Sequence, residues 1–558
     1  MNECGTNERT PTMATTHIQR KPVDSRSTLR RRKKTLALFV VLSLGIAAAL
    51  ALLLIGCGSG TSAPVAPPPI PTMQPLQIVD VQNIVQAAVN SVSVDMVVAV
   101  VDRAGFVLGV FRTQNAPATA TGNFGQTQNA NDVAVALART GAFFSNDQAP
   151  LSSRTVRFIS GIHFPPGVMN QGPADLYGIE NTNRGCTLIN DPNFESKIPP
   201  SRALPPGNVP GSGLGIITGK SDIVDSNAAA VNPSGVPIFF KNVALGGIGV
   251  VTASSNSNVA EFAAFAGSTT ARGGTGDSFG ATPAAPGVVF IGGVALPFVN
   301  QTSLPAGYSN GPVAGTGSYF VVASNSLGQP PENDLITPAP GPLGGLSAVD
   351  VKQILDNAEA TANTTRAAIR LPLGSKARMV IAVADLDGTI IGLRRMPDST
   401  VFSTDVAASK ARNMVYFNSA VRTAADLSGV PMGTAVTNRT ISFGAQPLYP
   451  PGIDGSSAGP FFNLYSMDLA NPCTQGFQTG AANSNKSGIV FFPGSAPLFR
   501  NGALVGGLGV SGDGVDQDDY VTSGGTKGFE APENIRADQI MDKGVRLPYF
   551  KFPRNPTN

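Results

Sequence analysis

The sequence of 558 residues predicts an α+β protein built from two tandem copies of one domain, each an antiparallel sheet with helices packed on it. Two observations predict this fold. Segments of residues 76–267 recur in the same order within residues 346–525, and such internal similarity is typical of duplicated domains. Within each copy, helical patterns alternate with tight hairpins, and short turns join antiparallel strands.

The first two repeated elements are a helix and a hairpin. Residues 78–89 (IVDVQNIVQAAV) and 348–359 (AVDVKQILDNAE) carry apolar residues at the i, i+3, i+4, i+7 spacing of an amphipathic helix. Residues 95–112 (DMVVAVVDRAGFVLGVFR) and 378–395 (RMVIAVADLDGTIIGLRR) then align without gaps. Each predicts two apolar strands around a turn that begins at Asp and ends at Gly.

Four further pairs of segments follow in the same order. The first pair, 131–146 with 404–419, is expected to be helical. The last pair, 237–251 with 497–511, is expected to form hairpins. Between them lie the pairs 153–167 with 438–452 and 176–187 with 464–474. The matches predict a first domain over 76–328, a Pro/Gly-rich linker over 329–345, a second domain over 346–530 and a tail over 531–558. The apolar stretch 287–299 is short and interrupted by Gly, which favours an additional hairpin over a membrane segment.

The N-terminal region predicts export and lipid anchoring. Residues 1–34 are polar and end in five basic residues, residues 36–55 are apolar, and Leu54-Ile55-Gly56-Cys57 follows. This order is typical of a signal peptide over 1–56, and the Cys after Leu-Ile-Gly resembles a bacterial lipobox with Cys57 as the acylated residue. The alternative is a signal anchor that spans the bilayer. Residues 57–75 are rich in Pro, Gly and Ser and predict a tether. We therefore expect an extracytoplasmic protein of the bacterial cell envelope, at the outer membrane or facing the periplasm.

Composition excludes several function classes. The net charge is +3 with 13% charged residues, and removal of the basic leader leaves a chain with no basic patch for nucleic acid. The sequence has four cysteines, which form no C-x-x-C motif, and two histidines, of which the mature chain keeps one. A two-His metal site is therefore excluded in the mature chain. We therefore predict no metal site formed by the chain's own residues and name no catalytic residue.

A family resemblance rests on motifs of the second copy. The helix LSAVDVKQILDNAE, the hairpin MVIAVADLDGTIIGLRRM, the D-x-A-x-x-K-A-R segment at 405–412 and the closing GALVGGLGVSGDGVDQDD at 502–519 resemble the HbpS/GlcG-like haem-binding or haem-degrading family. The resemblance covers most of 346–525 and, more weakly, 76–267. It implies a profilin-like fold, self-association and a haem-like ligand. The first copy departs from it, with Leu137 in place of Lys410.

The resemblance makes haem the expected cofactor, and three residues are candidate iron ligands. His163 is the only histidine of the mature chain, and its equivalent in the second copy is Leu448. Tyr177 and Tyr465 are equivalent positions, and tyrosinate binds ferric iron in some haem proteins. The alternatives are a loop histidine with an ordinary hydrogen bond and aromatic packing beside the loop.

Three cations are candidate ligand contacts. Arg139 and Arg412 are equivalent helix residues whose guanidinium groups suit a haem propionate. Their alternative is a helix-dipole interaction. Lys410 of the second copy is the third candidate. The acidic cluster that follows the last strand (Asp513, Asp516, Asp518 and Asp519) does not fit an EF-hand, and we expect it to begin a terminal helix.

Cys186 and Cys473 are equivalent positions of the two copies. If the copies pack about a pseudo-twofold axis, as homodimers do, these loops meet near it and a disulfide joins them. Two separate thiols are the alternative.

Three functions remain open at this point. The first is a lipid-anchored binding protein for haem or a related small ligand. The second is an enzyme acting on haem or a small organic substrate in the interdomain cleft. The third is a structural or adhesion lipoprotein without ligand. The scarcity of paired acid and base residues favours the first over the second.

Overall fold

The computed structural model describes residues 74–160, 178–183, 215–227, 229–280, 289–291, 294–453, 455–471, 473–474 and 487–557. The predicted signal peptide and residues 57–73 of the predicted tether, with Cys57, lie outside the described residues, as do His163, Tyr177 and Cys186. The helices of the described part of the chain are too short or too polar to cross a membrane.

Each repeat contains one five-stranded sheet, and all strand pairs in the two sheets are antiparallel. The first sheet has the order β5 (Gly235–Phe240), β6 (Val243–Thr252), β1 (Met96–Asp102), β2 (Val107–Arg112) and β9 (Ser318–Val321). The second has the equivalent order β13 (Ser495–Arg500), β14 (Ala503–Gly512), β11 (Met379–Ala384), β12 (Ile390–Arg395) and β10 (Asn333–Ile336). The predicted linker therefore contains β10, a strand of the second sheet.

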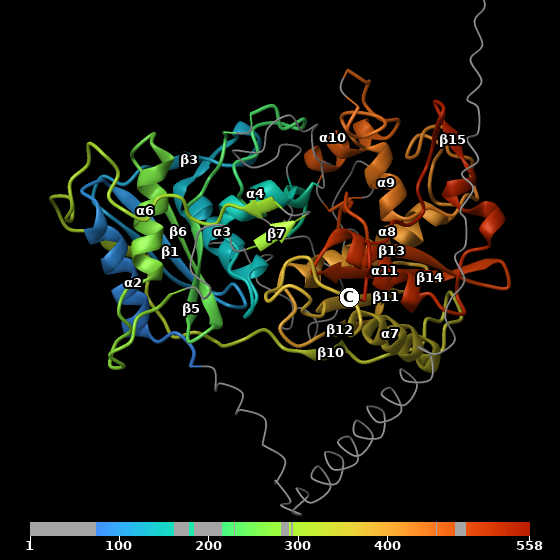
Figure 1. Ribbon diagram of the computed structural model, residues 1–558, viewed down its shortest axis with the longest axis horizontal. Coiled ribbons are helices and arrows are strands. Elements are labelled where there is room, and N and C mark those ends of the chain that lie inside the picture. The colour runs from blue at the N-terminus through green and yellow to red at the C-terminus, as the bar shows by residue number, and fades with distance from the viewer. Residues whose placement is uncertain are drawn as a thin grey trace, which may run out of the picture. The chain divides into compact units, whose positions relative to one another are not determined.

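Helices cover both faces of each sheet (Figure 1). In the first repeat, α2 (Ile78–Ser91) and α6 (Ser257–Ser268) pack on one face and α3 (Ala130–Phe144) on the other. In the second, α7 (Ala348–Ala362) and α11 (Val515–Gly525) pack on one face and α8 (Ser403–Asn418) on the other. The predicted α+β fold, with two antiparallel sheets and helices packed on each, is confirmed.

The alternation of side chains along the central strands explains why both faces are apolar. Met96, Val98 and Val100 of β1 join the core beneath α2 and α6, whereas Val97 and Ala99 join the core beneath α3. Successive side chains of a strand point to opposite faces of the sheet. A continuous apolar run therefore predicts a strand buried on both sides.

Strand glycines set how closely the central helices approach the sheets. A Cβ at Gly247 or Gly249 would collide with carbonyl oxygens of α3, and one at Gly507 or Gly509 with carbonyl oxygens of α8. The Gly-Gly-Ile-Gly and Gly-Gly-Leu-Gly runs are thus packing features, as expected for glycines beneath a close backbone.

The remaining elements lie in the connections and in the segment that follows α11. The helices are α4 (Ser153–Ser160), α9 (Asn438–Gly444) and α10 (Phe462–Ala470), and the 3-10 turns are η1 (Asn123–Gly125), η2 (Ile179–Asn181), η3 (Glu533–Ile535) and η4 (Ala537–Gln539). Three two-stranded ribbons pair β3 (Thr119–Thr121) with β4 (Thr127–Asn129), β7 (Val289–Ile291) with β8 (Val294–Leu296), and β15 (Met541–Asp542) with β16 (Val545–Arg546). The β7–β8 pair is the hairpin predicted within 287–299.

The two repeats share one hydrophobic core cluster. The rings of Phe144, at the end of α3, and Phe402, at the start of α8, stack with centroids 4.0 Å apart and planes inclined by 11°. The backbone N–H of Val401 donates to the carbonyl oxygen of Phe143 at 2.9 Å. The Nδ2 atom of Asn146 donates to the carbonyl oxygen of Ile369 at 3.1 Å. The junction between the repeats therefore combines apolar packing with hydrogen bonds.

Candidate functional site

A buried lysine from the first repeat meets a tyrosine from the second. Lys220 precedes β5 and its side chain is fully buried, and Tyr465 lies in α10. The Nζ atom of Lys220 donates to the phenol oxygen of Tyr465 at 3.1 Å and lies 3.8 Å from a carboxylate oxygen of Glu180. We call Lys220, Tyr465 and Glu180 the seam cluster.

Aromatic rings surround the lysine of the seam cluster. Nζ of Lys220 lies 5.3 Å from the centroid of the Tyr465 ring and 5.9 Å from that of Phe124. The Tyr465 ring packs edge-on against Phe491 at 5.0 Å. Burial lowers the pKa of Lys220, and the carboxylate of Glu180 opposes that change. The arrangement places an amine of reduced basicity beside a phenol, away from water.

Equivalent segments of the two repeats meet at the seam cluster. Asn181 in η2 donates from Nδ2 to the carboxylate of Asp468 in α10 at 3.0 Å. Gly178, which directly follows Tyr177, packs against the Tyr465 ring so closely that a Cβ there would collide with it. These residues belong to the matched segments 176–187 and 464–474. Equivalent loops thus lie together, as the pseudo-twofold hypothesis expects.

Cys473 follows α10, is buried and is disulfide-bonded. Cys186, its predicted partner, is outside the described residues, so the Cys186–Cys473 pairing stays a prediction. Of the three predicted iron ligands, the described residues include Tyr465 alone.

Arg139 and Arg412 take the same role in the two repeats. The Nε atom of Arg139 donates to the carbonyl oxygen of Gly105 at 2.9 Å, and Arg412 donates to Gly388 at 2.8 Å. Both side chains are buried, and burial lowers the pKa of Arg139 to about 10. Each arginine thus supports the turn of the hairpin in its own sheet. Both lie well inside their helices, so the expected interaction with a helix C-terminus is not the observed one.

Lys410 is fully buried in an ion pair. Its Nζ donates to the carbonyl oxygen of Val510 at 2.6 Å and to the Asp518 carboxylate at 3.0 Å, and lies 4.6 Å from the centroid of the Phe492 ring. Burial lowers the pKa of Lys410 and raises that of Asp518 to about 7.

The other acids after β14 also have cationic partners. Asp513 accepts from Arg370 at 2.5 Å, and Arg439 binds Asp516 at 2.5 Å and Asp519 at 2.7 Å. Asp516 and Asp518 lie in the first turn of α11, as expected for the start of a terminal helix. Within the described ranges, no group of three or more His, Cys, Asp and Glu side chains is arranged to hold a metal ion.

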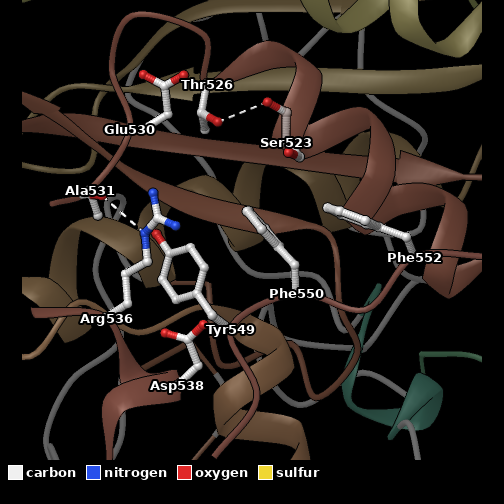
Figure 2. Close-up of a pocket in the computed structure, with 9 residues that line it drawn as sticks. All are labelled: Ser523, Thr526, Glu530, Ala531, Arg536, Asp538, Tyr549, Phe550 and Phe552. Carbon is white, nitrogen blue, oxygen red and sulfur yellow. Dashed lines mark hydrogen bonds between the residues drawn. The ribbon is translucent and has the colours of Figure 1, made fainter. Parts of the chain in front are cut away.

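A cavity of about 360 Å³ lies beside the end of α11 (Figure 2). Ser523 and Thr526 line one part of it, and the rest comes from residues 530–552, most of which were predicted to be a tail. That segment is packed: Leu547 and Tyr549 belong to a core cluster with residues of α8, α9 and α10.

Sequence reasoning missed Lys220 and this cavity. Lys220 stands alone in a polar and Gly-rich segment that has no clear counterpart in the second repeat, and nothing in its neighbours indicates burial. The cavity depends on how residues 530–552 fold back on α11, for which the sequence shows no periodic pattern.

A family model and two solved structures match about a third of the chain. Residues 346–527 match the family model of the haem-degrading protein HbpS-like family, which confirms the predicted resemblance there. A crystal structure of a PduOC–heme complex is similar at 24% identity, over 34% of this chain and 96% of that chain, with a TM-score of 0.22. The Klebsiella pneumoniae protein ORFY is similar at 19% identity, over 33% and 90%, with a TM-score of 0.22. No curated protein matches the chain.

Proposed function

We propose that this chain is an exported, lipid-anchored protein that binds haem or a closely related planar ligand. The observation that carries the proposal is the match of residues 346–527, which include four of the five strands of the second sheet, to the HbpS-like family model. The duplication adds a first repeat that shares a hydrophobic core with the second.

The seam cluster has suitable chemistry for a ferric haem. The phenol oxygen of Tyr465 is an oxygen donor of the kind that ligates ferric haem iron in some proteins. The Nζ atom of Lys220, 3.1 Å away, would donate a hydrogen bond to that oxygen. Both side chains are buried, so hemin would reach them only where the seam opens. Bound haem would bring iron and its redox chemistry to this donor pair.

Hemin titration of the mature protein tests the proposal. We expect a saturable shift of the Soret band with purified wild-type protein. Tyr465→Phe changes the position and shape of that band if the phenol is a ligand, and Tyr520→Phe, which alters a half-buried tyrosine of α11, leaves it unchanged. His163→Ala and Tyr177→Phe test the other two predicted ligands in the same way. Absence of a saturable shift at micromolar hemin would contradict the proposal and favour a structural or adhesion role.

The family description favours degradation of haem as the second candidate function. Its test is the time course of the bound Soret band after addition of ascorbate under air. A decay that requires protein and yields free iron, detected with a ferrous chelator, would assign an enzyme. A band that persists as long as the complex itself would leave a binding protein.

The proposed anchor rests on the Leu54-Ile55-Gly56-Cys57 sequence at the end of an apolar run. We expect metabolic labelling with a fatty acid to mark the wild-type protein in the envelope fraction, and Cys57→Ser to abolish the label. Cys4→Ser is the matched control, since Cys4 lies in the leader. Label retained in Cys57→Ser would overturn the assignment of Cys57 as the acylated residue, and wild-type protein that stays in the envelope fraction without label would favour a signal anchor.

A further inference from the structure

The cavity beside α11 carries an inference that is independent of haem binding. Its wall comes mainly from residues 530–552, which follow the part of the chain matched by the family model. Glu530 and Phe552 are exposed, so the cavity is open to solvent. Its volume of about 360 Å³ is near the lower end of the range for small-molecule sites. It therefore suits a ligand smaller than a porphyrin.

Two carboxylates give the cavity its negative charges. The Oδ1 atom of Asp538 is buried and has no hydrogen-bond partner in the described part of the chain. Asp538 also lines the cavity, so a ligand donor there would meet a carboxylate whose Oδ1 atom receives no hydrogen bond from the described residues. Glu530, an exposed residue that also lines the cavity, accepts from the backbone N–H of Gly528 through Oε2 at 2.9 Å.

One guanidinium group provides the positive charge. Arg536 donates from Nε to the carbonyl oxygen of Ala531 at 3.0 Å, which fixes the side chain without using its two terminal amino groups. The guanidinium lies 5.3 Å from the centroid of the Tyr549 ring, a stacking that orients it further. Figure 2 shows Arg536 and Asp538 beside this ring. A cation held in this way is suited to a carboxylate.

An aromatic wall completes the cavity. The rings of Phe550 and Phe552 are stacked, with centroids 5.9 Å apart and planes inclined by 29°. The Tyr549 ring meets Phe550 edge-on, with centroids 4.8 Å apart. Phe552 is 47% exposed although it is a large apolar residue. Figure 2 shows the two phenylalanine rings side by side, away from Arg536. This wall suits an apolar or aromatic group.

We propose that the cavity binds a small zwitterion with an apolar or aromatic side chain, such as an amino acid or a short peptide. The ammonium group would pair with Asp538, the carboxylate with Arg536, and the side chain would lie on Phe550 and Phe552. Arg536 would repel a ligand that carries only positive charge. Asp538 and Glu530 would repel one that carries only negative charge. A ligand with both charges is the one that satisfies all three residues.

Calorimetric titration of the mature protein with three related probes tests the charge requirement. They are L-phenylalanine, phenethylamine, which lacks the carboxylate, and 3-phenylpropanoate, which lacks the ammonium group. We expect saturable binding of L-phenylalanine and at least tenfold weaker binding of the other two. Equal affinity for all three probes, or no saturable heat with L-phenylalanine up to about 1 mM, would overturn the proposal.

Variants of the charged residues test the assignment of each group. Asp538→Asn, which preserves shape, is expected to lower the affinity for L-phenylalanine at least tenfold, and Arg536→Gln to do the same. Glu533→Gln is the matched control, because Glu533 is an exposed acid of the neighbouring η3 turn that does not line the cavity. Thermal melting checks that each variant is folded. Unchanged affinity in folded Asp538→Asn protein would overturn the proposal, whatever Arg536→Gln does.

Discussion

The Nζ atom of Lys220 lies 3.1 Å from the phenol oxygen of Tyr465, and this hydrogen bond joins the two repeats. Lys220 has no exposed surface and Tyr465 has 1%. A lysine is rarely buried unless its ammonium group is paired. The nearest carboxylate oxygen, from Glu180, is 3.8 Å away. The phenol is therefore a principal polar partner of the lysine, and it comes from the other repeat.

Tyr465→Phe is expected to destabilise the protein by about 1–3 kcal/mol, because it removes the acceptor of a buried donor while keeping the ring. The measurement is the free energy of unfolding from urea titration. Tyr520→Phe is the matched control and is expected to have an effect within about 0.5 kcal/mol. A loss in Tyr465→Phe no greater than the control's would contradict the role given to the phenol.

The shared core predicts that the two repeats unfold together. Phe144 and Phe402 stack at 4.0 Å across the junction, and both are buried. Phe402→Ala is expected to cost about 3–5 kcal/mol. Because the Phe402 ring contacts both repeats, we expect the variant to lose protection against hydrogen exchange in both repeats. Hydrogen exchange followed by mass spectrometry measures this protection. Loss of protection in the second repeat alone would show that the repeats are energetically independent.

Stability is expected to depend on pH through Asp102. Its carboxylate accepts from the backbone N–H groups of Phe106 at 2.9 Å and Leu327 at 3.1 Å. Burial nevertheless raises its pKa to about 6. A raised pKa in the folded state means that the folded protein binds the proton more tightly than the unfolded chain. Protonation of Asp102 thus stabilises the folded protein. This contribution is complete below about pH 4 and is lost as the pH rises through about 6.

The comparison of wild type with Asp102→Asn isolates this effect. The stability of wild type relative to the variant is expected to fall by about 3 kcal/mol between pH 4 and pH 7, since the pKa difference is about two units. Urea unfolding across that range measures it. Asp387→Asn, at an exposed turn position of the second repeat, serves as the control and should show no such trend. A constant difference for Asp102→Asn would refute the assignment.

The fold was predictable because its elements follow local rules. The hairpin over 95–112 needs only apolar strands around a turn with a Gly, and Gly105 has the positive φ of 88° that such a turn requires. The equivalent glycine, Gly388, has φ 85°. Because the domain is duplicated, each of these elements could be recognised in two copies. In both repeats an arginine of the central helix supports this turn through the same hydrogen bond, which alignment of the helices alone did not predict.

The candidate site was less predictable because its contacts are long-range. Tyr465 was a candidate from its equivalence to Tyr177, but its partner Lys220 is 245 residues away. The acids after β14 were recognised as a helix start, yet each pairs with a cation far along the chain. Local patterns report which side chains an element exposes. They do not report which distant side chain it meets.

Cys473 is disulfide-bonded, and the pairing with Cys186 is a prediction from repeat equivalence. We expect peptide mapping of unreduced mature protein to yield one cross-linked peptide that contains both cysteines and separates on reduction. Because Asn181 contacts Asp468 between the same two segments, the cross-link would fasten a junction that hydrogen bonds already form. Two thiols that alkylate without reduction would contradict the pairing.

Lys410 and Asp518 form a buried ion pair that the first repeat lacks, since Leu137 occupies the position of Lys410 and is itself buried. Gly267 of α6 and Gly525 of α11 contact equivalent residues of the two repeats, and this equivalence places the buried Ala260 at the position of Asp518. In the first repeat, uncharged residues thus occupy both of the equivalent positions. Lys410→Leu alone leaves the Asp518 carboxylate buried without its cation, and we expect a loss of about 3–5 kcal/mol.

The double variant Lys410→Leu with Asp518→Asn is expected to recover most of that loss, because neither position then carries a charge that needs a buried partner. Asp518→Asn alone leaves the ammonium group of Lys410 with the carbonyl oxygen of Val510, 2.6 Å away, and is expected to cost less than Lys410→Leu. Urea unfolding of the four proteins gives the coupling energy directly. If the double variant is as unstable as the sum of the two single variants, the pair is not coupled, and the lysine stabilises the second repeat through its packing on Phe492 instead.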